Sequence, residues 1–127
     1  MPSFSHASAS KLDTCDKPLQ DLFNEVIKHW DCTILEGHRG EEAQMLAYQE
    51  GKSHAKWGQS KHNSSPSKAV DVAPYPVDWN DIERFKQFGQ FVKGLAIGMG
   101  ISIRWGGDFH NLHDYPHFEL INDQAIS

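Results

Sequence analysis

Lys68-Ala69-Val70-Asp71-Val72-Ala73 holds the strongest evidence for how this chain folds. Small and β-branched apolar residues flank Asp71 on both sides, which predicts a buried strand that ends at Pro74. A buried carboxylate is costly unless it is paired with a cation or bound to a metal. Asp71 therefore indicates either an ion pair, with Arg39 or with a lysine, or a ligand in a metal site.

Upstream of this strand, the sequence predicts two helices and one further strand. Residues 1–17 are rich in Ser, Ala and Lys and predict an irregular lead-in. A helix begins at Pro18, and its apolar residues follow the three- and four-residue spacing of one buried face. That face consists of Leu19, Leu22, Phe23, Val26, Ile27 and Trp30. Residues 32–35 predict a strand, and residues 40–50 predict a second helix with acidic residues in its first turn.

Downstream, residues 51–67 form a long polar loop, and loops of this length are usually functional or disordered. A long helix begins after a cap at Asp78 or Asn80 and ends at Gly98 and Gly100. Its predicted buried stripe is Ile82, Phe85, Phe88, Val92, Leu95 and Met99. Residues 101–105 and 117–121 predict two more strands. Helices and strands mix without regular alternation, so we expect a single α+β domain over residues 1–127 with a largely antiparallel sheet.

Composition excludes several classes of function. The chain has 127 residues, 39% of them hydrophobic, and a formal net charge of −5, which is unfavourable for general nucleic-acid binding. No long apolar run could span a membrane, and the N-terminus lacks the basic start and apolar stretch of a signal peptide. We expect a monomer made in the cytoplasm, without nucleic-acid or integral membrane partners.

The two cysteines, Cys15 and Cys32, stand on either side of the first predicted long helix. A helix of about 13 residues at about 1.5 Å per residue would hold them roughly 20 Å apart. A disulfide needs Cα atoms within about 7 Å, so we expect two buried, unpaired thiols.

Two short motifs supply the other candidate metal ligands. They are Ser60-Lys61-His62 and Asp114-Tyr115-Pro116-His117-Phe118-Glu119. A zinc hydrolase needs three protein ligands, an open position for water and a nearby carboxylate to accept the proton of that water. His62, Asp71 and His117 form a candidate ligand set, and Asp114 is the candidate base.

The surroundings of His117 leave two alternatives open for Glu119. Strand alternation would place both side chains on one face, where Glu119 either orients the imidazole or faces solvent. His113 and His117 have the spacing of a helical zinc motif, but Pro116 would break that helix, so we reject this interpretation. His110 and His113 are either ligands, substrate-facing groups or ordinary loop histidines. Arg39 is either a surface arginine or a fork that binds a substrate oxygen.

In order along the chain, the motifs are Gly37-His38-Arg39 with Gln44, Ser60-Lys61-His62, Ala69-Val70-Asp71, Trp105-Gly106-Gly107-Asp108-Phe109 and Asp114-Tyr115-Pro116-His117-Phe118. This ordered set resembles the M15 zinc metallopeptidases, which include D-Ala-D-Ala carboxypeptidases and phage endolysins that cleave L-alanyl-D-glutamate bonds. The resemblance covers about residues 19–120 and implies a hedgehog/DD-peptidase-like fold, an antiparallel sheet backed by helices.

The resemblance also implies roles for individual residues. His62, Asp71 and His117 would bind Zn²⁺, Asp114 would be the catalytic base, and Arg39 would anchor or polarise the substrate. Ser60, Gln44 and Trp105 would contact the substrate. The sequence departs from the common family pattern in the long excursion at residues 63–68, between the histidine and the aspartate. Its aspartate at the base position, where the dipeptidase branch carries Glu, favours the endolysin branch.

We therefore expect a zinc peptidase that hydrolyses the peptide stems of bacterial peptidoglycan, typical of a phage or prophage endolysin. Such an enzyme would stay in the host cytoplasm until a separate membrane-permeabilising protein released it to the cell wall. One alternative is a D-Ala-D-Ala carboxypeptidase or dipeptidase with the same site. The other is a non-catalytic wall-binding module with a structural zinc, for which His110 or His113 would have to supply a fourth ligand.

Overall fold

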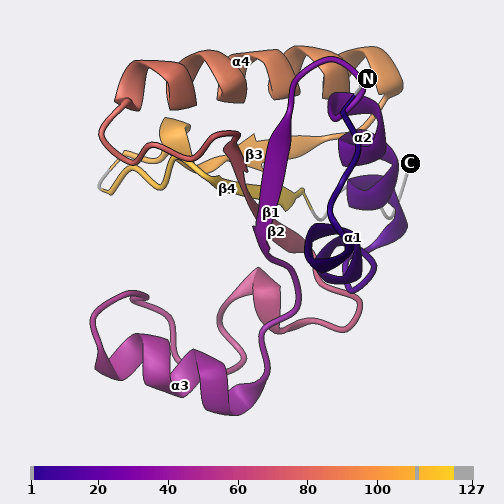
Figure 1. The fold of residues 1–127 in the computed structure, drawn as a ribbon. Helices are drawn as coiled ribbons and strands as arrows, with labels where there is room; N and C mark the ends of the chain where they lie inside the picture. The colour runs from indigo at the N-terminus through magenta and orange to yellow at the C-terminus, as the bar shows by residue number, and fades with distance from the viewer. Residues whose placement is uncertain (1, 111, 122–127) are drawn as a thin grey trace.

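The computed structural model describes residues 2–110 and 112–121, and its architecture is α+β. Figure 1 shows the order of the elements along the chain. The helices are α1 (His6–Leu12), α2 (Lys17–Val26), α3 (Glu41–Gln49) and α4 (Ile82–Met99), with short 3-10 turns η1 (Lys61–Asn63) and η2 (Gly106–Asp108). The strands are β1 (Cys32–Glu36), β2 (Ala69–Pro74), β3 (Ile103–Trp105) and β4 (His117–Leu120).

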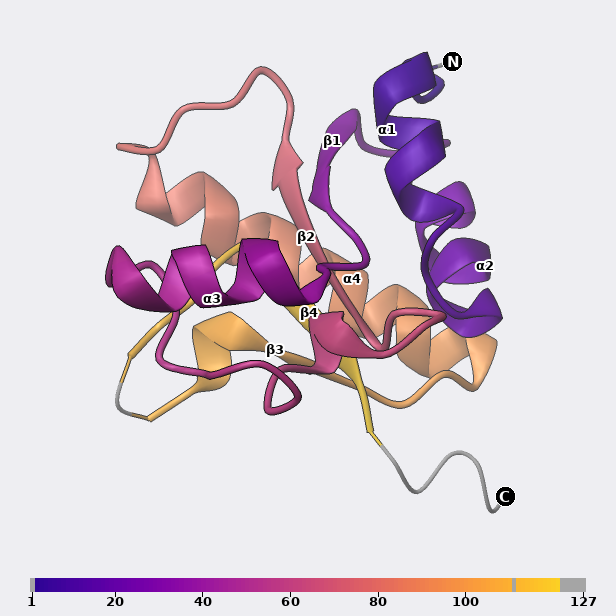
Figure 2. The same cartoon turned by 90° about the horizontal axis from the view of Figure 1, so that it is seen from below.

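The strands form one four-stranded sheet in the order β1-β2-β4-β3, and every neighbouring pair is antiparallel. The predicted antiparallel α+β fold is therefore confirmed. Helices α3 and α4 lie on opposite sides of this sheet, as Figures 1 and 2 show together. Helix α3 therefore lies on the side of the sheet away from the main core (Figure 1), and polar side chains can occupy that side.

The core lies between the sheet and helices α2 and α4. Phe118 on β4 is fully buried, and its ring packs edge-on against Phe23 of α2 at 5.3 Å and against Phe88 of α4 at 6.2 Å. Burial of such aromatic rings removes a large apolar area from water and is the main stabilising contribution of a small core. The two cysteines are buried and unpaired, as expected.

The prediction of an irregular lead-in at residues 1–17 is wrong, because this segment contains α1. Ser5 caps the helix by accepting a hydrogen bond from the backbone N–H of Ser8 at 3.1 Å. The hydroxyl of Ser8 in turn accepts from the backbone N–H of Ile34 on β1, and Leu12 joins the core. A helix that buries so few apolar residues leaves no amphipathic pattern in the sequence, which explains the error.

Helix α4 differs from its prediction in two details. Its cap is Asp81, whose side chain accepts from the N–H of Arg84 at 3.1 Å, rather than Asp78 or Asn80. The buried stripe includes Phe85, Phe88 and Val92 as predicted, but Ile82 and Met99 are exposed, because they are the first and last residues of the helix. The small residues Gly89 and Ala96 complete the buried face instead.

Among residues 2–110 and 112–121, no helix has both the length and the apolar character that crossing a membrane requires.

Candidate metal centre and active-site cavity

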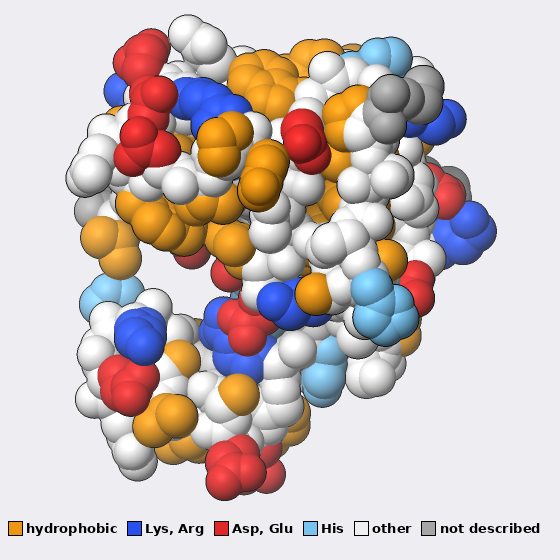
Figure 3. Space-filling model, viewed as in Figure 1, with side chains coloured by type: hydrophobic (Ala, Val, Ile, Leu, Met, Phe, Trp, Pro, Cys, Tyr) orange, Lys and Arg blue, Asp and Glu red, His pale blue; other side chains and the backbone are white. Residues whose placement is uncertain are grey.

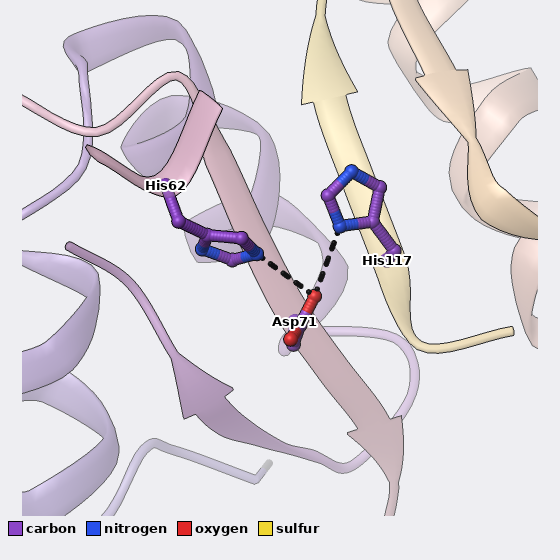
Figure 4. Close-up of side chains that lie close together, drawn as sticks. All are labelled: His62, Asp71 and His117. Atoms are coloured by element: carbon purple, nitrogen blue, oxygen red, sulfur yellow. Dashed lines mark hydrogen bonds and ion pairs between the residues drawn. The ribbon is translucent and has the colours of Figure 1, made fainter. Parts of the chain in front are cut away.

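The sheet brings two of the three predicted ligands together. Asp71 in the middle of β2 lies directly opposite His117 at the start of β4, and Glu36 of β1 lies opposite Asp71 on its other side. His62 reaches the same point from η1. Figure 4 shows the three side chains pointing toward one another from these separate segments.

The distances between these side chains suit one metal ion. Asp71 Oδ1 lies 3.2 Å from His62 Nε2 and 3.2 Å from His117 Nδ1, and the three ligand atoms all lie within 4.8 Å of one another. Ligand atoms in a tetrahedral zinc site are about 3.3 Å apart, because zinc–ligand bonds are about 2.0–2.1 Å long. Two imidazoles and a carboxylate are also a donor set that zinc accepts in catalytic sites. The residues present therefore fit a zinc ion.

The second nitrogen of each histidine has its own partner. His62 Nδ1 lies 2.7 Å from the carbonyl oxygen of Gly37, and His117 Nε2 lies 2.8 Å from Glu119 Oε1. Because a carbonyl oxygen can only accept, Nδ1 of His62 must donate, so Nε2 is the nitrogen that can give up its proton and offer a lone pair to a metal. The backbone at Gly37 thus selects the useful tautomer of His62.

Burial and hydrogen bonds act in opposite directions on the protonation of the cluster. Burial by itself would raise the pKa of the Asp71 carboxyl, but hydrogen bonds from His117 and His62 outweigh burial and hold that pKa well below its usual range. Burial would likewise lower the pKa of His117, but its hydrogen bonds to Asp71 and Glu119 raise that pKa to about 9. Asp71 is therefore ionised at neutral pH, as a metal ligand must be.

Asp114 lies at the edge of this cluster, with its Oδ2 atom 4.0 Å from His117 Nδ1 and half of its side chain exposed. Burial of the carboxyl group and the negative charge of Asp71 raise the pKa of Asp114 above its usual value. Its backbone N–H donates to the carbonyl oxygen of Gly106. A Cβ added at Gly106 would lie only 2.0 Å from the carbonyl oxygen of Asp114. Gly106 thus allows the close approach that fixes Asp114.

Arg39 also faces the cluster, but it is not paired with Asp71. Its Nε and Nη2 atoms donate to Glu36 Oε1 at 2.9 and 2.5 Å, and Nη1 donates to Gln44 Oε1 at 2.8 Å. Among the described residues, the hydrogen-bond partners of Asp71 are instead His62 and His117. The ion pair with Arg39 that the sequence left open is therefore not formed.

These residues line an open cavity of about 340 Å³. Figure 3 shows a hollow between the part of the molecule that carries α3 and the rest. The cavity is lined by Arg39, Lys52, Ser53, His54, Ser60, His62, Asp71, Phe109, Leu112, Asp114 and His117. The lining therefore combines the cations Arg39 and Lys52 with the carboxylates Asp71 and Asp114, and Phe109 and Leu112 add apolar surface.

Gln44 and Trp105, predicted from the resemblance to contact substrate, do not line this cavity. Gln44 is fully buried and holds Arg39, while its own amide donates to the carbonyl oxygen of Ala55 at 2.6 Å. Trp105 is a core residue whose Nε1 donates to the carbonyl oxygen of Tyr115. Gln44 thus holds Arg39 in place, and Trp105 is bonded to the loop that leads to His117. Ser60 does line the cavity, and its hydroxyl accepts from the backbone N–H of His62.

Asn63 was not predicted as a site residue, yet its side chain bonds to three parts of the site. Its Oδ1 accepts from the N–H of Ser60, and its Nδ2 donates to the carbonyl oxygen of Arg39 and to Gln44 Oε1. The spacing of Ser60 and Asn63 is that of a reciprocal helix cap, which could have indicated this role.

The remaining loop histidines lie outside the metal cluster. His113 Nδ1 bonds the carbonyl oxygen of Gly107, and its ring stacks on Tyr115 at 5.6 Å. Within the described residues, neither His110 nor His113 belongs to the cluster, which consists of His62, Asp71 and His117. A catalytic zinc site has three protein ligands and a free position, whereas a structural site has four. The geometry thus favours a catalytic site over a structural one.

Comparisons with known proteins identify relatives of this chain. Residues 2–123 match the model of the phage L-alanyl-D-glutamate peptidase family. The L-alanyl-D-glutamate peptidase of Escherichia phage T5 is 32% identical over 93% of this chain and 97% of its own length. The peptidoglycan L-alanyl-D-glutamate endopeptidase CwlK of Bacillus subtilis is 29% identical over 72% of this chain and 61% of its own.

A solved structure extends the likeness to three dimensions. The crystal structure of the Serratia marcescens L-Ala D-Glu endopeptidase ChiX superposes with a TM-score of 0.82 at 26% identity, over 98% of this chain and 93% of that one. The family match covers nearly all of the sequence, from the first helix past the last strand. The chain therefore belongs to the phage L-alanyl-D-glutamate peptidase family.

Proposed function

We propose that this protein is a zinc-dependent endopeptidase that hydrolyses the bond between L-alanine and D-glutamate in peptidoglycan stem peptides, and that it serves as a phage or prophage endolysin. The observation that carries the proposal is the convergence of His62, Asp71 and His117 in an open cavity, with Asp114 beside them. The names of the phage T5, CwlK and ChiX relatives support the choice of bond.

The chain's own groups can be given distinct tasks. A zinc ion held by His62, Asp71 and His117 would supply Lewis-acid activation of the scissile carbonyl and of the attacking water. Asp114 would accept the proton of that water and pass it to the leaving amine. Its half-exposed position lets it reach solvent and substrate alike.

Arg39 and the cavity walls would bind and orient the peptide. The guanidinium of Arg39 is held by Glu36 and Gln44, so its orientation is set before substrate arrives, which lowers the entropic cost of binding. Lys52 and His54 in the cavity lining suit a carboxylate of the stem peptide, and Phe109 and Leu112 suit an apolar side chain such as that of alanine.

The test is the mass of the products released from purified cell walls by the zinc-loaded protein. We expect fragments whose new N-terminus is D-glutamate, complete loss of release in a chelator, and recovery when zinc is added back. His117→Ala, which removes a ligand, is the matched control and should be inactive with or without zinc. Release of single D-alanine residues, or full activity in the chelator, would overturn the proposal.

A further inference from the structure

Glu119 is a buried carboxylate that none of the catalytic steps above uses. Glu119 lies two residues after His117 on β4, and only 8% of its surface is exposed. Its Oε1 atom is 2.8 Å from His117 Nε2. The neighbouring Phe118 and Leu120 point the other way, into the core. Glu119 therefore lies on the ligand face of the strand, behind the imidazole of His117.

The other oxygen of this carboxylate faces two cations. Lys61 Nζ lies 3.2 Å from Glu119 Oε2, and Arg104 Nη1 lies 3.6 Å from the same atom. The Lys61 side chain is 28% exposed, and that of Arg104 is 58% exposed. Because solvent screens the exposed pair more strongly, Lys61 is the more effective partner.

Lys61 also binds the backbone of β4. Its Nζ atom donates to the carbonyl oxygen of Leu120 at 2.6 Å, so Lys61 contacts β4 at two adjacent residues, Glu119 and Leu120. Lys61 immediately precedes His62 in the chain. The segment that carries one histidine ligand is thereby attached to the strand that carries the other.

The hydrogen bond from His117 has a direct chemical consequence. An ionised carboxylate can only accept, so Nε2 of His117 must carry a proton and the ring must present Nδ1 toward Asp71. Nδ1 is the nitrogen that belongs to the metal cluster. A carboxylate behind a ligand histidine fixes its tautomer and raises its basicity toward the metal.

We propose that Glu119 and Lys61 are positioning residues of the zinc site, in which Glu119 holds His117 with Nδ1 toward the metal and Lys61 holds Glu119. The inference rests on the proposed zinc site. It assigns a task to the middle residue of Ser60-Lys61-His62, whose side chain lies outside the cavity lining.

The test uses four variants of the full chain. Glu119→Ala removes the acceptor, Glu119→Gln keeps an accepting oxygen without the charge, and Lys61→Met removes the cation that holds Glu119. Lys68→Met is the matched control, because it breaks a comparable ion pair, with Asp16, that links β2 to the start of α2 without contacting His117.

Two measurements do not depend on catalysis. The first is zinc affinity by competition with a chromophoric chelator. Loss of a partner behind a metal ligand costs about 10- to 100-fold in affinity, which we expect for Glu119→Ala, with smaller losses for Glu119→Gln and Lys61→Met. Lys68→Met should bind zinc as the parent does.

The second measurement is the NMR signal of the His117 ring N–H in the zinc-loaded protein. A proton held by a buried carboxylate exchanges slowly with water, so the signal should be visible in the parent, in Lys68→Met and, shifted, in Glu119→Gln. It should vanish in Glu119→Ala. A general loss of stability would weaken zinc binding without changing this signal selectively.

The outcomes separate this inference from the proposed function. If the parent binds no zinc, both fail. If the parent binds zinc and cleaves cell walls, but Glu119→Gln and Lys61→Met bind zinc within about threefold of the parent and keep the parent's ring N–H signal, only the positioning role is overturned. These two variants decide the matter even if Glu119→Ala does not fold, which a thermal melt of each variant would reveal.

Discussion

Asp114 and His117 lie three residues apart and share one wall of the cavity, but the chemistry expected of them differs. His117 supplies a nitrogen to the metal cluster, whereas Asp114 stays outside the cluster, 4.0 Å from that nitrogen and half exposed. Substitutions at the two positions should therefore separate metal binding from proton transfer.

We predict that Asp114→Asn retains zinc but loses turnover by about a hundredfold or more, because the amide keeps the size of the carboxyl group and cannot accept a proton. Zinc content and the rate of cell-wall cleavage, measured on the same sample, check this. His117→Ala is the comparison and should lose both. Near-normal turnover of Asp114→Asn would mean that the base lies elsewhere.

Arg39 allows a second prediction at this scale, because its fork engages Glu36 and Gln44 together. A lysine has a single cationic centre and cannot reproduce both contacts. We expect Arg39→Lys to keep the fold and the zinc but to cleave at least about tenfold more slowly.

Arg39→Ala should in addition destabilise the fold by about 0.5–1.5 kcal/mol, because it removes the hydrogen bonds to Glu36 and Gln44, while Gln44 Oε1 keeps its bond from Asn63. Arg84→Lys is the matched control. Two guanidinium nitrogens of Arg84 likewise donate to two acceptors, the carbonyl oxygens of Tyr75 and Pro76, but Arg84 does not line the cavity. Equal loss of cleavage in Arg84→Lys and Arg39→Lys would contradict a substrate role for Arg39.

At the scale of elements, helix α4 is held against the sheet by a close contact at Gly89. A Cβ added at Gly89 would lie 2.2 Å from Cε2 of Trp105, whereas one added at Gly94 in the same helix would meet nothing within 4 Å. Alanine substitutions at Gly89 and Gly94 therefore distinguish the effect of packing from the effect of helix propensity within one helix.

We predict that Gly89→Ala destabilises the protein by about 1–3 kcal/mol, because Trp105 must move within a packed core. Gly94→Ala should instead stabilise it by up to about 1 kcal/mol, since alanine favours the helix and nothing crowds it. Urea unfolding of both variants provides the measurement. A stabilised Gly89→Ala would show that Trp105 adjusts freely and does not fix the helix.

The same scale explains what the sequence could predict. Asp71 stands out because apolar residues flank it, and the alternation of His117 with Phe118 follows from strand geometry alone. Helix α1 left no such signal, because its buried contacts depend on the hydroxyl of Ser8. The bond of Lys61 to β4 joins residues far apart in sequence, and no local pattern reports such a contact.

Trp105 shows what a motif leaves open. It was predicted to contact substrate because it belongs to one of the family motifs, and its ring is buried beside Gly89 and Gly107. A motif identifies a residue without indicating whether its side chain packs inward or faces the cavity. Only the tertiary arrangement distinguishes these roles.

For the whole molecule, the metal cluster joins the segment around η1 to the central strands, in addition to the contacts that Lys61 makes with β4. His62 belongs to η1, which leads back to α3 and the cavity wall, whereas Asp71 and His117 belong to the central strands. A bound metal would thus tie the part of the molecule around α3 to the sheet. Its removal should loosen that part first, while the core between α2, α4 and the sheet persists.

We therefore predict that zinc raises the free energy of unfolding, by about 4 kcal/mol when free zinc exceeds its dissociation constant about a thousandfold. Thermal melts with added zinc and with a chelator measure this shift. His117→Ala should show no zinc-dependent shift, whereas Asp114→Asn should show the full one, because Asp114 is not part of the cluster. Hydrogen exchange should locate the loss of protection on chelation at residues 37–63. Uniform loss across β2 and α4 would contradict the view that the metal joins two parts of unequal stability.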